Sequence, residues 1–368
     1  MSKQLHILVI SNYNDPINPV RPEAEIYLSL IDLGFIVTVM TEKGSTYAEL
    51  LRKKGADVID YRPKRKIDFE AMALIRECVH SGEVDVVHAF NSKAIVNSTL
   101  ALWRNKVKIV GYRGYTGNIK WYDLSSYVAF LNPRLDYMVC LADSVREMFI
   151  KSGMPKHKAV TIHKGHKAEW YDHIEKGDLS EFNFPAEATV FALIANNRTK
   201  MKGIHVLVEA SDLIPANHLV RFLLIGRGMD TPEIKDMISK TLNPERFVFA
   251  GFRDNVLSLV KACDVSISAS LFGEATQKAM IEAMYLGNPV VITDIPGNKN
   301  MAVDKEGGRV VAPGDAQTLA QGITWMLENK DRLSDLGTAA KKHISEFLGN
   351  DKTVKSYAEF YTRITVKK

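Results

Sequence analysis

The chain has 368 residues, of which 46% are hydrophobic and 25% are charged, and its formal net charge is +5 at pH 7. These values exclude a disordered chain, and the length suits two domains of ordinary size. The first apolar run is too short for a signal peptide and no stretch is long enough to cross a bilayer. Cys78, Cys140 and Cys263 lie too far apart for a disulfide framework or a zinc site, so we expect a reducing, cytoplasmic location.

Short apolar runs alternate with amphipathic stretches along the first half of the chain. Continuous Val/Ile runs between helical patterns are typical of parallel strands that are buried on both faces. The predicted strands are 5–11, 35–40, 56–61, 84–90 and 108–112, and the predicted helices are 23–33, 46–54, 67–81 and 92–103.

The same alternation restarts after a polar and aromatic stretch at 164–187. Strands are predicted at 189–195, 220–226, 246–251, 264–270, 288–294 and 308–313, and helices at 315–328, 330–346 and 351–363. The pattern predicts an α/β protein with two Rossmann-like, doubly wound parallel-sheet domains. We expect the domains at 1–167 and 168–349, with 350–368 forming a helix that packs back on the first, and a ligand in the cleft between them.

The positive charge belongs to the first half. Residues 1–167 hold 24 Lys and Arg against 17 Asp and Glu, whereas residues 168–368 hold 24 against 26. The sequence YRPKRK at 61–66 is either a solvated face or a contact for an anionic small molecule or an anionic membrane. No nucleic-acid-binding motif accompanies it, so nucleic acid is not expected as a partner.

Common cofactor and catalytic motifs are missing. The first strand is followed by SNYNDP rather than by G-x-G-x-x-G, and Gly226 and Gly228 form only a lone G-x-G, which is typical of a tight turn. His88 lies near the end of the predicted strand 84–90, where a histidine more often belongs to the core than to a site. No nucleophile elbow, Walker loop or zinc-protease motif is present.

Four charged residues of the second half remain as candidates. Arg198 and Lys202 lie between a predicted strand and a helix, and an Arg with a Lys is a common pair for a diphosphate. Glu274 and Glu282 lie eight residues apart, either on one helix or with Glu274 in the preceding loop, about 12 Å away along the axis. A helix N-terminus there would bind an anion, and Glu274 would accept hydrogen bonds from sugar hydroxyls.

These motifs resemble the retaining glycosyltransferases of family four (group 1), of bacterial type, which have two facing Rossmann-like domains in the GT-B architecture. The resemblance covers nearly the whole chain. It is most specific in NRTKMKGIHVLVEA, in FLLIGRG, in VFAGFRDNVLSLVKACDVSISAS and in the E-x7-E of GEATQKAMIEAMYLGNPVV.

The resemblance implies roles for these residues. Arg198 and Lys202 would hold the donor diphosphate, Glu282 the ribose and Glu274 the donor sugar. Further donor contacts would come from the backbone of Ala275, Thr276 and Gln277 and, near the base, from Gly226, Phe252 and Arg253.

The chain departs from the family pattern in the first half. A Gly-Gly turn is replaced by INPVRPEAE, where Arg21 would supply a side-chain contact instead. A donor-sugar histidine is missing after the fifth strand, where Arg113 stands, followed by Tyr115. We keep Arg21, Arg113, Tyr115 and His88 as acceptor or donor-sugar candidates.

The resemblance predicts retaining transfer from a UDP- or GDP-linked sugar to a glycan, lipid-linked or cell-envelope acceptor, as in polysaccharide and lipopolysaccharide biosynthesis. No D-x-D motif lies at a strand end, so no metal and no cofactor are expected. Aromatic and basic residues at 112–134 suit a sugar chain, a lipid-linked acceptor or an anionic membrane surface, or simply a packed helix. The alternatives are a nucleotide-sugar epimerase and a nucleotide-sugar-binding protein with little turnover.

Overall fold

The computed structural model describes residues 4–14, 17–117 and 119–366, with the backbone alone for 17–19. Its contacts divide the chain into a first unit, residues 1–166 with 350–368, and a second unit, residues 167–349. Each unit is a parallel sheet with helices around it, so the predicted fold of two Rossmann-like domains is confirmed.

The first unit holds a seven-stranded sheet in the order β3-β2-β1-β4-β5-β6-β7, and every pairing is parallel. Its strands are β1 (His6–Ile10), β2 (Ile36–Met40), β3 (Asp57–Ile59), β4 (Val86–Ala89), β5 (Lys108–Arg113), β6 (Tyr137–Cys140) and β7 (Ala159–Thr161). Its helices are α1 (Ile17–Asp32), α2 (Thr46–Lys54), α3 (Phe69–Ser81), α4 (Ser92–Ala101), α5 (Leu124–Val128), α6 (Asp143–Lys151) and α14 (Asn350–Thr365).

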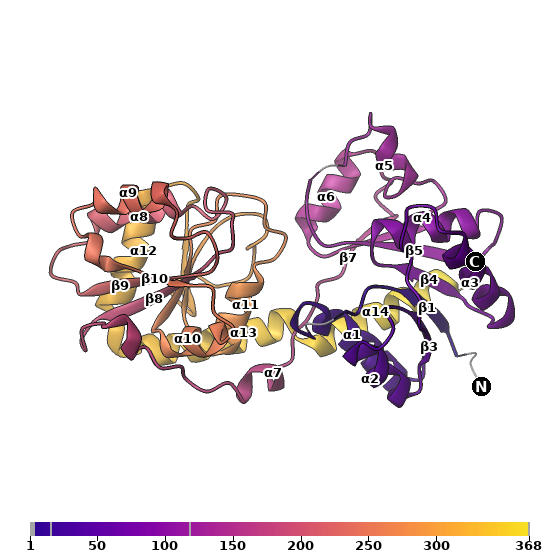
Figure 1. Cartoon of the computed structure of the whole chain (residues 1–368), viewed down its shortest axis with the longest axis horizontal. Coiled ribbons are helices and arrows are strands. Elements are labelled where there is room, and N and C mark those ends of the chain that lie inside the picture. Colours follow the sequence, from indigo (N-terminus) through magenta and orange to yellow (C-terminus); the bar gives the residue numbers. More distant parts are fainter. Residues whose placement is uncertain (1–3, 15–16, 118, 367–368) are drawn as a thin grey trace. The chain divides into compact units, whose positions relative to one another are not determined.

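The helix α14 completes the core of the first unit although it follows the second unit in the chain. Figure 1 shows this yellow helix beside the indigo and purple elements of the first unit. Tyr357, Phe360 and Tyr361 are fully or almost fully buried in the same cluster as Ile7 and Val9 of β1. Residues 350–366 therefore pack against the core of the first unit.

The second unit holds a six-stranded parallel sheet in the order β10-β9-β8-β11-β12-β13. Its strands are β8 (Thr189–Ile194), β9 (Val220–Ile225), β10 (Phe247–Gly251), β11 (Val265–Ser268), β12 (Val290–Thr293) and β13 (Gly308–Val311). Its helices are α7 (Glu169–Asp172), α8 (Ile204–Leu213), α9 (Pro232–Ser239), α10 (Val256–Ala262), α11 (Lys278–Tyr285), α12 (Ala316–Glu328) and α13 (Leu333–Leu348), with 3-10 turns η1 (Ser180–Phe182), η2 (Pro244–Arg246) and η3 (Lys330–Arg332). Apolar clusters fill both faces of this sheet.

One helix start differs from the prediction, and a second one decides between two alternatives. The helix α1 begins at Ile17, six residues before the predicted start, and Pro22 lies inside it. The ring of Pro22 fixes a helical φ, so this proline near the N-terminus removes one hydrogen bond without ending the helix. The helix α11 begins at Lys278, four residues after Glu274, which therefore lies in a loop.

Candidate functional site

The candidate site lies in the second unit, at the carboxyl edge of its sheet. Strands β8 and β11 are neighbours, but β9 and β10 extend the sheet on one side while β12 and β13 extend it on the other. At such a switch point the loops that follow the two central strands diverge and leave a crevice for a ligand. These loops, 195–203 after β8 and 269–277 after β11, carry most of the donor-site residues predicted from the sequence.

Glycines let these loops approach each other. A Cβ at Gly203, whose φ is +65°, would lie 2.0 Å from the carbonyl oxygen of Ala269. A Cβ at Gly226 would lie 1.7 Å from the carbonyl oxygen of Ala195. Because neither distance is possible for a real side chain, these positions require glycine. The loops after β8, β9 and β11 are thus held backbone to backbone.

The close approach brings together two residues that are 72 positions apart in the chain. Lys202 Nζ lies 2.6 Å from Glu274 Oε1, and the two side chains are only 18% and 13% exposed. The backbone of Glu274 is held in turn by Gly297, where a Cβ would lie 2.2 Å from the Glu274 carbonyl oxygen. Arg198, on the same loop as Lys202, is exposed to solvent. The site therefore presents two cations and one carboxylate from fixed loops.

The N-terminus of α11 directly follows the loop that carries Glu274. Gln277 is its N-cap residue and is 2% exposed, and its side chain makes no capping hydrogen bond. The side-chain nitrogen of Gln277 has no hydrogen-bond partner among the described residues. Ala275 is buried and Thr276 half-buried just before it. A buried amide donor beside the free N–H groups of a helix start is a suitable environment for an anion.

Glu282 lies inside α11, one turn after the helix start. Its carboxylate is 15% exposed and lies 3.1 Å from Lys278 Nζ, an i,i+4 pair on one helix face. Glu274 lies in the loop and Glu282 lies in the helix, so the two carboxylates are separated along the helix direction. The structure therefore contains the second of the two predicted arrangements of the E-x7-E motif. The carboxylates can contact different parts of one elongated ligand.

The residues proposed near the base lie after β9 and β10. The N–H of Gly226 donates to the carbonyl of Gly251, which holds the two turns together. Phe252 is 51% exposed, and Arg227 lies 4.3 Å from its ring centre. Arg227 was not among the predicted residues, although its place between the glycines of GRG is a signal that could have identified it.

Arg253 is engaged elsewhere. Its Nη2 lies 2.6 Å from Glu181 Oε2, and its Nε donates to the carbonyl of Ala250 at 2.9 Å. These contacts tie the segment around η1 to the end of β10. The structure thus assigns the Arg253 side chain two protein partners, while Phe252 beside it stays exposed.

Arg113 of the first unit is buried under aromatic rings. Its guanidinium donates to the carbonyls of Tyr115 and Gly117 and lies 3.6 Å from the Tyr115 ring centre and 4.5 Å from that of Phe130. Burial lowers the pKa of Arg113 from its ordinary value. Arg113 therefore shapes the loop after β5, and Tyr115 is exposed on top of it.

His88 belongs to the core of the first unit. It is fully buried, and its Nδ1 lies 2.6 Å from the Tyr361 hydroxyl and 3.1 Å from that of Tyr27. Burial, with a smaller effect of nearby Lys164, lowers the pKa of His88 to about 3, so the ring is neutral at pH 7.

Arg21 lies on α1, beside Tyr47. His88 and Arg21 are not brought into one cluster with Arg113.

A buried ion pair of the first unit was not predicted. Lys164, which follows β7, lies 2.8 Å from Glu23 of α1, and the side chains are 19% and 10% exposed. The hydroxyl of Ser11 donates to the same carboxylate, and Lys164 Nζ lies 4.5 Å from the ring centre of Tyr112. The charge pattern HKGHK indicated a cation, but nothing in the sequence indicated its partner 141 residues away.

Within residues 4–14, 17–117 and 119–366, no group of three or more His, Cys, Asp or Glu side chains has the arrangement of a metal site. Over the same residues, no helix is both long enough and apolar enough to span a bilayer.

Two family models match the chain. Residues 24–170 match Glycosyltransferase Family 4, and residues 176–343 match Glycosyl transferases group 1. The second match contains every residue that the sequence predicts for a donor site. The chain belongs to the group 1 glycosyltransferases of the GT-B fold.

Individual proteins are similar to the chain at low identity. The phosphatidyl-myo-inositol mannosyltransferase of Mycolicibacterium smegmatis is 24% identical over 69% of this chain and 65% of its own length, so the chain spans just under two-thirds of that relative. A glycosyltransferase from Rickettsia africae is 20% identical, with a TM-score of 0.79 and full coverage of both chains. Anabaena HepE, solved with UDP and glucose, is 20% identical with a TM-score of 0.73, over 98% of this chain and all of its own. At these identities the structures establish the fold.

Proposed function

We propose that the protein transfers a sugar from a nucleoside-diphosphate sugar to a hydroxyl of a glycan, lipid-linked or cell-envelope acceptor, with retention of anomeric configuration and without a metal ion. The observation that carries this proposal is the Lys202–Glu274 pair at the switch point, beside the unpartnered amide of Gln277. A UDP-linked donor is favoured over a GDP-linked one because HepE was solved with UDP and glucose. The name of the mycobacterial relative favours a lipid acceptor.

The site supplies cations and N–H donors where the leaving group needs them. As the bond to the nucleoside diphosphate breaks, negative charge gathers on its phosphate oxygens. Arg198, Lys202 and the N–H groups at the start of α11 would offset that charge, so a divalent ion is not required. Glu274 would accept hydrogen bonds from donor sugar hydroxyls, and Glu282 from the ribose.

The reaction would proceed on one face of the donor sugar. The acceptor oxygen forms a new bond to the anomeric carbon while the bond from that carbon to the diphosphate oxygen breaks. The acceptor proton passes to the departing phosphate, whose charge has just increased. Bond formation and cleavage on the same face retain the configuration, and no carboxylate has to act as a nucleophile.

The proposed compartment is the cytoplasm. All three cysteines are free thiols, two of them buried, as in a protein that folds under reducing conditions. A cytoplasmic enzyme that uses a lipid-linked acceptor would work at the inner face of the cell membrane.

A thermal-shift screen would test the donor site first. The protein is heated with UDP, GDP, CMP or ADP and with their common sugar conjugates, because a ligand that binds the folded state raises the melting temperature. We expect a shift with one nucleotide family that is lost in Arg198→Ala and Glu282→Ala and kept in Lys200→Ala, an exposed cation of the same loop. No shift with any nucleotide would contradict the donor site.

Product analysis would test the reaction. We expect the native protein to form a glycoside and Glu274→Ala to bind nucleotide without forming one. If the protein only binds nucleotide sugars, neither the native protein nor the variant will form a glycoside. An NMR spectrum of the product should show the anomer of the donor; the opposite anomer would refute retention. Release of an epimerised sugar instead of a glycoside would favour the epimerase.

A further inference from the structure

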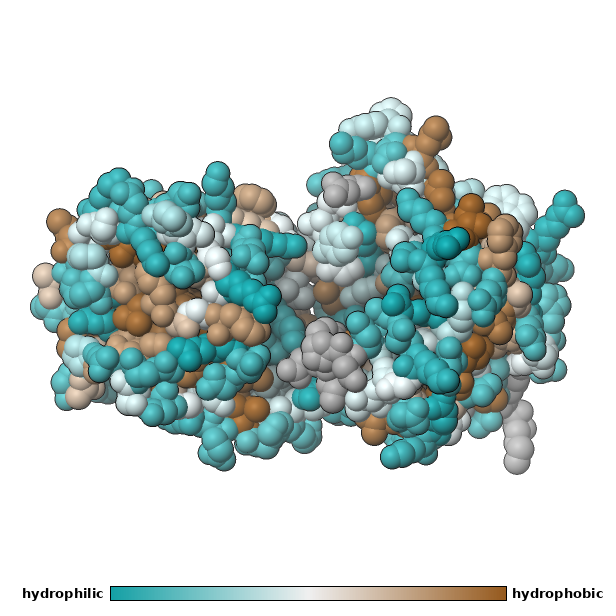
Figure 2. All heavy atoms as spheres, viewed as in Figure 1, coloured by the Kyte–Doolittle hydropathy of each residue, from teal (hydrophilic) through white to brown (hydrophobic). Residues whose placement is uncertain are grey.

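One side of the first unit carries large apolar side chains that are exposed. They come from the start of α3, the end of α4 and the region of α5, and their exposure runs from 41% to 84%. Figure 2 shows brown, apolar residues over α5 and down along α4 and α3. We call this surface the α3–α5 face, and its apolar members are Ile67, Phe69, Leu100, Trp103, Trp121, Tyr122, Leu124, Tyr127 and Val128.

The basic segment YRPKRK borders this face because α4 holds it there. The side-chain amide of Asn97 on α4 donates to the carbonyls of Arg65 and Lys66, and its oxygen accepts from the N–H of Asp68. Lys93 donates to the carbonyl of Lys64 at 2.7 Å. The YRPKRK segment, which has no role in the proposed donor site, is therefore fixed beside α4.

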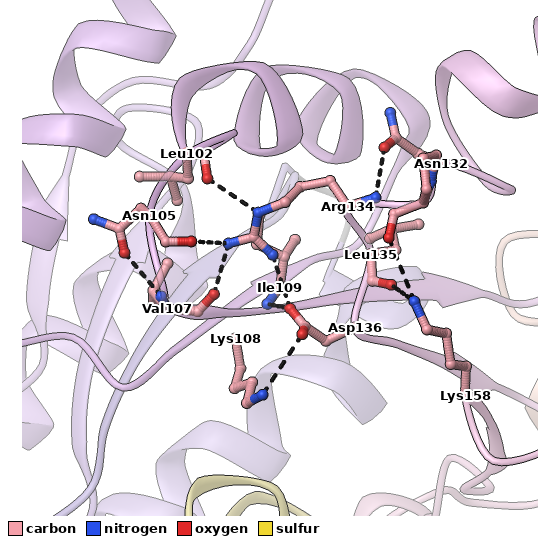
Figure 3. Close-up of polar contacts among 11 residues, drawn as sticks. Leu102, Asn105, Val107, Lys108, Ile109, Asn132, Arg134, Leu135, Asp136 and Lys158 are labelled. Atoms are coloured by element: carbon pink, nitrogen blue, oxygen red, sulfur yellow. Dashed lines mark hydrogen bonds and ion pairs between the residues drawn. The ribbon is translucent and has the colours of Figure 1, made fainter.

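The end of α4 is also fixed to the segment that follows α5. The guanidinium of Arg134 donates to the carbonyls of Leu102, Asn105 and Val107 at 2.8 to 3.0 Å, and it pairs with Asp136 (Figure 3). Trp103 lies within the chain segment that Arg134 binds. The exposed Trp103 is thus carried by a braced part of the unit rather than by a loose loop.

The charge around the face is positive. Lys64, Arg65 and Lys66 are exposed and form no ion pair within the described part of the chain. The carboxylates of Asp68 and Asp123 accept N–H bonds at the starts of α3 and α5. The first unit as a whole has 28 Lys and Arg against 19 Asp and Glu, whereas the second has 20 against 24.

We propose that the α3–α5 face binds an anionic lipid bilayer. Trp and Tyr favour the boundary between headgroups and acyl chains, and Leu, Ile and Phe gain free energy by entering it. A nucleic acid or acidic glycan would satisfy the cations but offers no apolar layer for Leu124, which is 84% exposed. In a symmetric dimer through this face, two copies of the same cationic segment would meet and repel each other.

Vesicle co-sedimentation of the full chain would test this proposal independently of any activity. The probes are vesicles of phosphatidylcholine alone and of phosphatidylcholine with phosphatidylglycerol. We expect binding to the mixed vesicles only, and weaker binding as salt rises. Each cation near an anionic surface contributes roughly fivefold to binding, so changing Lys64, Arg65 and Lys66 together to Gln should lower the partition coefficient about a hundredfold.

Variants in the apolar part and matched variants in the second unit complete the test. Phe69→Ser with Leu124→Ser should lower vesicle binding strongly, whereas Leu242→Ser, 77% exposed in the second unit, should not. Changing Lys240, Lys299 and Lys330 of the second unit to Gln controls for net charge. Equal effects of face and control variants, or equal binding to neutral and anionic vesicles, would overturn the proposal.

Tryptophan fluorescence supplies a second readout. Trp103 and Trp121 are two of the four tryptophans and are 57% and 65% exposed. Their emission should shift to shorter wavelength on mixed vesicles, and the shift should be lost in Trp103→Phe with Trp121→Phe. A dimer in gel filtration that Phe69→Ser with Leu124→Ser dissociates would instead identify the face as a contact between copies and overturn the proposal.

Discussion

The two units have ion pairs at the carboxyl edges of their sheets, but the pairs have different surroundings. Lys164–Glu23 and Lys202–Glu274 are similar in distance, 2.8 and 2.6 Å, and both are mostly buried. In the first unit the Glu23 carboxylate also accepts a hydrogen bond from the Ser11 hydroxyl, and the Lys164 amine lies over aromatic rings, so both charged groups have further contacts. Asn12 Oδ1 and His88 Nε2 of this unit are buried without a partner among the described residues, but they belong to neither charged group. In the second unit an exposed Arg198 and the unpartnered amide of Gln277 lie on the same two loops.

We interpret the first pair as structural and propose a ligand site around the second. Burying a polar group without a partner costs free energy, so a native protein keeps such groups mainly where a ligand, water or ion completes them. Glycine at positions 203 and 226 lets the backbones of the second unit's loops approach each other with no side chain between them. In the first unit, the rings of Tyr112 and Phe90 lie against Lys164 at the carboxyl edge of the sheet.

The largest expected effect tests the structural pair. Lys164→Met leaves the Glu23 carboxylate buried without its cation, so the free energy of unfolding should fall by about 3–5 kcal/mol. Urea denaturation followed by far-UV circular dichroism would measure this loss. The double variant Lys164→Met with Glu23→Gln removes both charges and should recover most of the loss. An unchanged midpoint in the single variant would refute the structural role.

The next effect tests the glycine contacts of the second unit. Gly203→Ala combines a left-handed φ with a Cβ directed at the backbone of Ala269, so it should cost more than about 2 kcal/mol. Gly55→Ala is the matched control, because its φ is +102° but no atom lies within 4 Å of the new Cβ. It should cost only about 1–2 kcal/mol. Equal losses in thermal or urea unfolding would mean that backbone conformation, and not loop contact, explains both.

The dependence of stability on pH tests the core of the first unit. His88 has a folded pKa of about 3 and an ordinary value of 6.5, so between these values the unfolded chain binds the extra proton. The contribution of His88 is therefore complete above pH 6.5 and is lost as the pH falls, by about 1.4 kcal/mol per unit. Unfolding at pH 7.5 and 5 should show a smaller difference for His88→Gln than for the native protein, whereas exposed His80→Gln should leave the difference unchanged.

The smallest effect comes from an exposed pair. The side chains of Arg253 and Glu181 are 32% and 49% exposed. Exposed ion pairs of this kind contribute about 0.2–1 kcal/mol to the free energy of unfolding. Glu181→Gln should therefore change the melting temperature little, and less at high salt. A loss as large as that of Lys164→Met would show that burial does not distinguish the two ion pairs.

The sequence predicted all six strands of the second sheet and five of the seven strands of the first, because parallel strands buried on both faces have continuous apolar sequences. It did not predict β6 and β7, the short strands at one edge of the first sheet. The sequence also placed Arg198 between a strand and a helix, and it gave the loop as one of two positions for Glu274. It did not predict that Lys202 contacts Glu274, because that contact depends on the close approach of Gly203 to Ala269, far along the chain. Nor did it predict that α1 begins at Ile17. A proline usually marks the start or the end of a helix, but Pro22 lies inside α1 near its N-terminus, where it is tolerated.

The partners of charged side chains were the least predictable feature. Arg113 was a candidate because of its position after the fifth predicted strand, and His88 was one near the end of the fourth. Aromatic rings and tyrosine hydroxyls surround them in the core. Those contacts join residues up to 273 positions apart, and no local pattern records them. Roles in binding for Arg21, Arg113, Tyr115 and His88 stay predictions.

The position of α14 affects how the protein is made. Because the second unit, residues 167–349, is inserted before α14, the ribosome completes it while the first unit still lacks Tyr357, Phe360 and Tyr361. Domains generally fold as units during synthesis, so the second domain can reach its native state before the first. The apolar groove that receives α14 stays open until the last helix emerges, and a nascent chain stalled near residue 349 would expose it to chaperones.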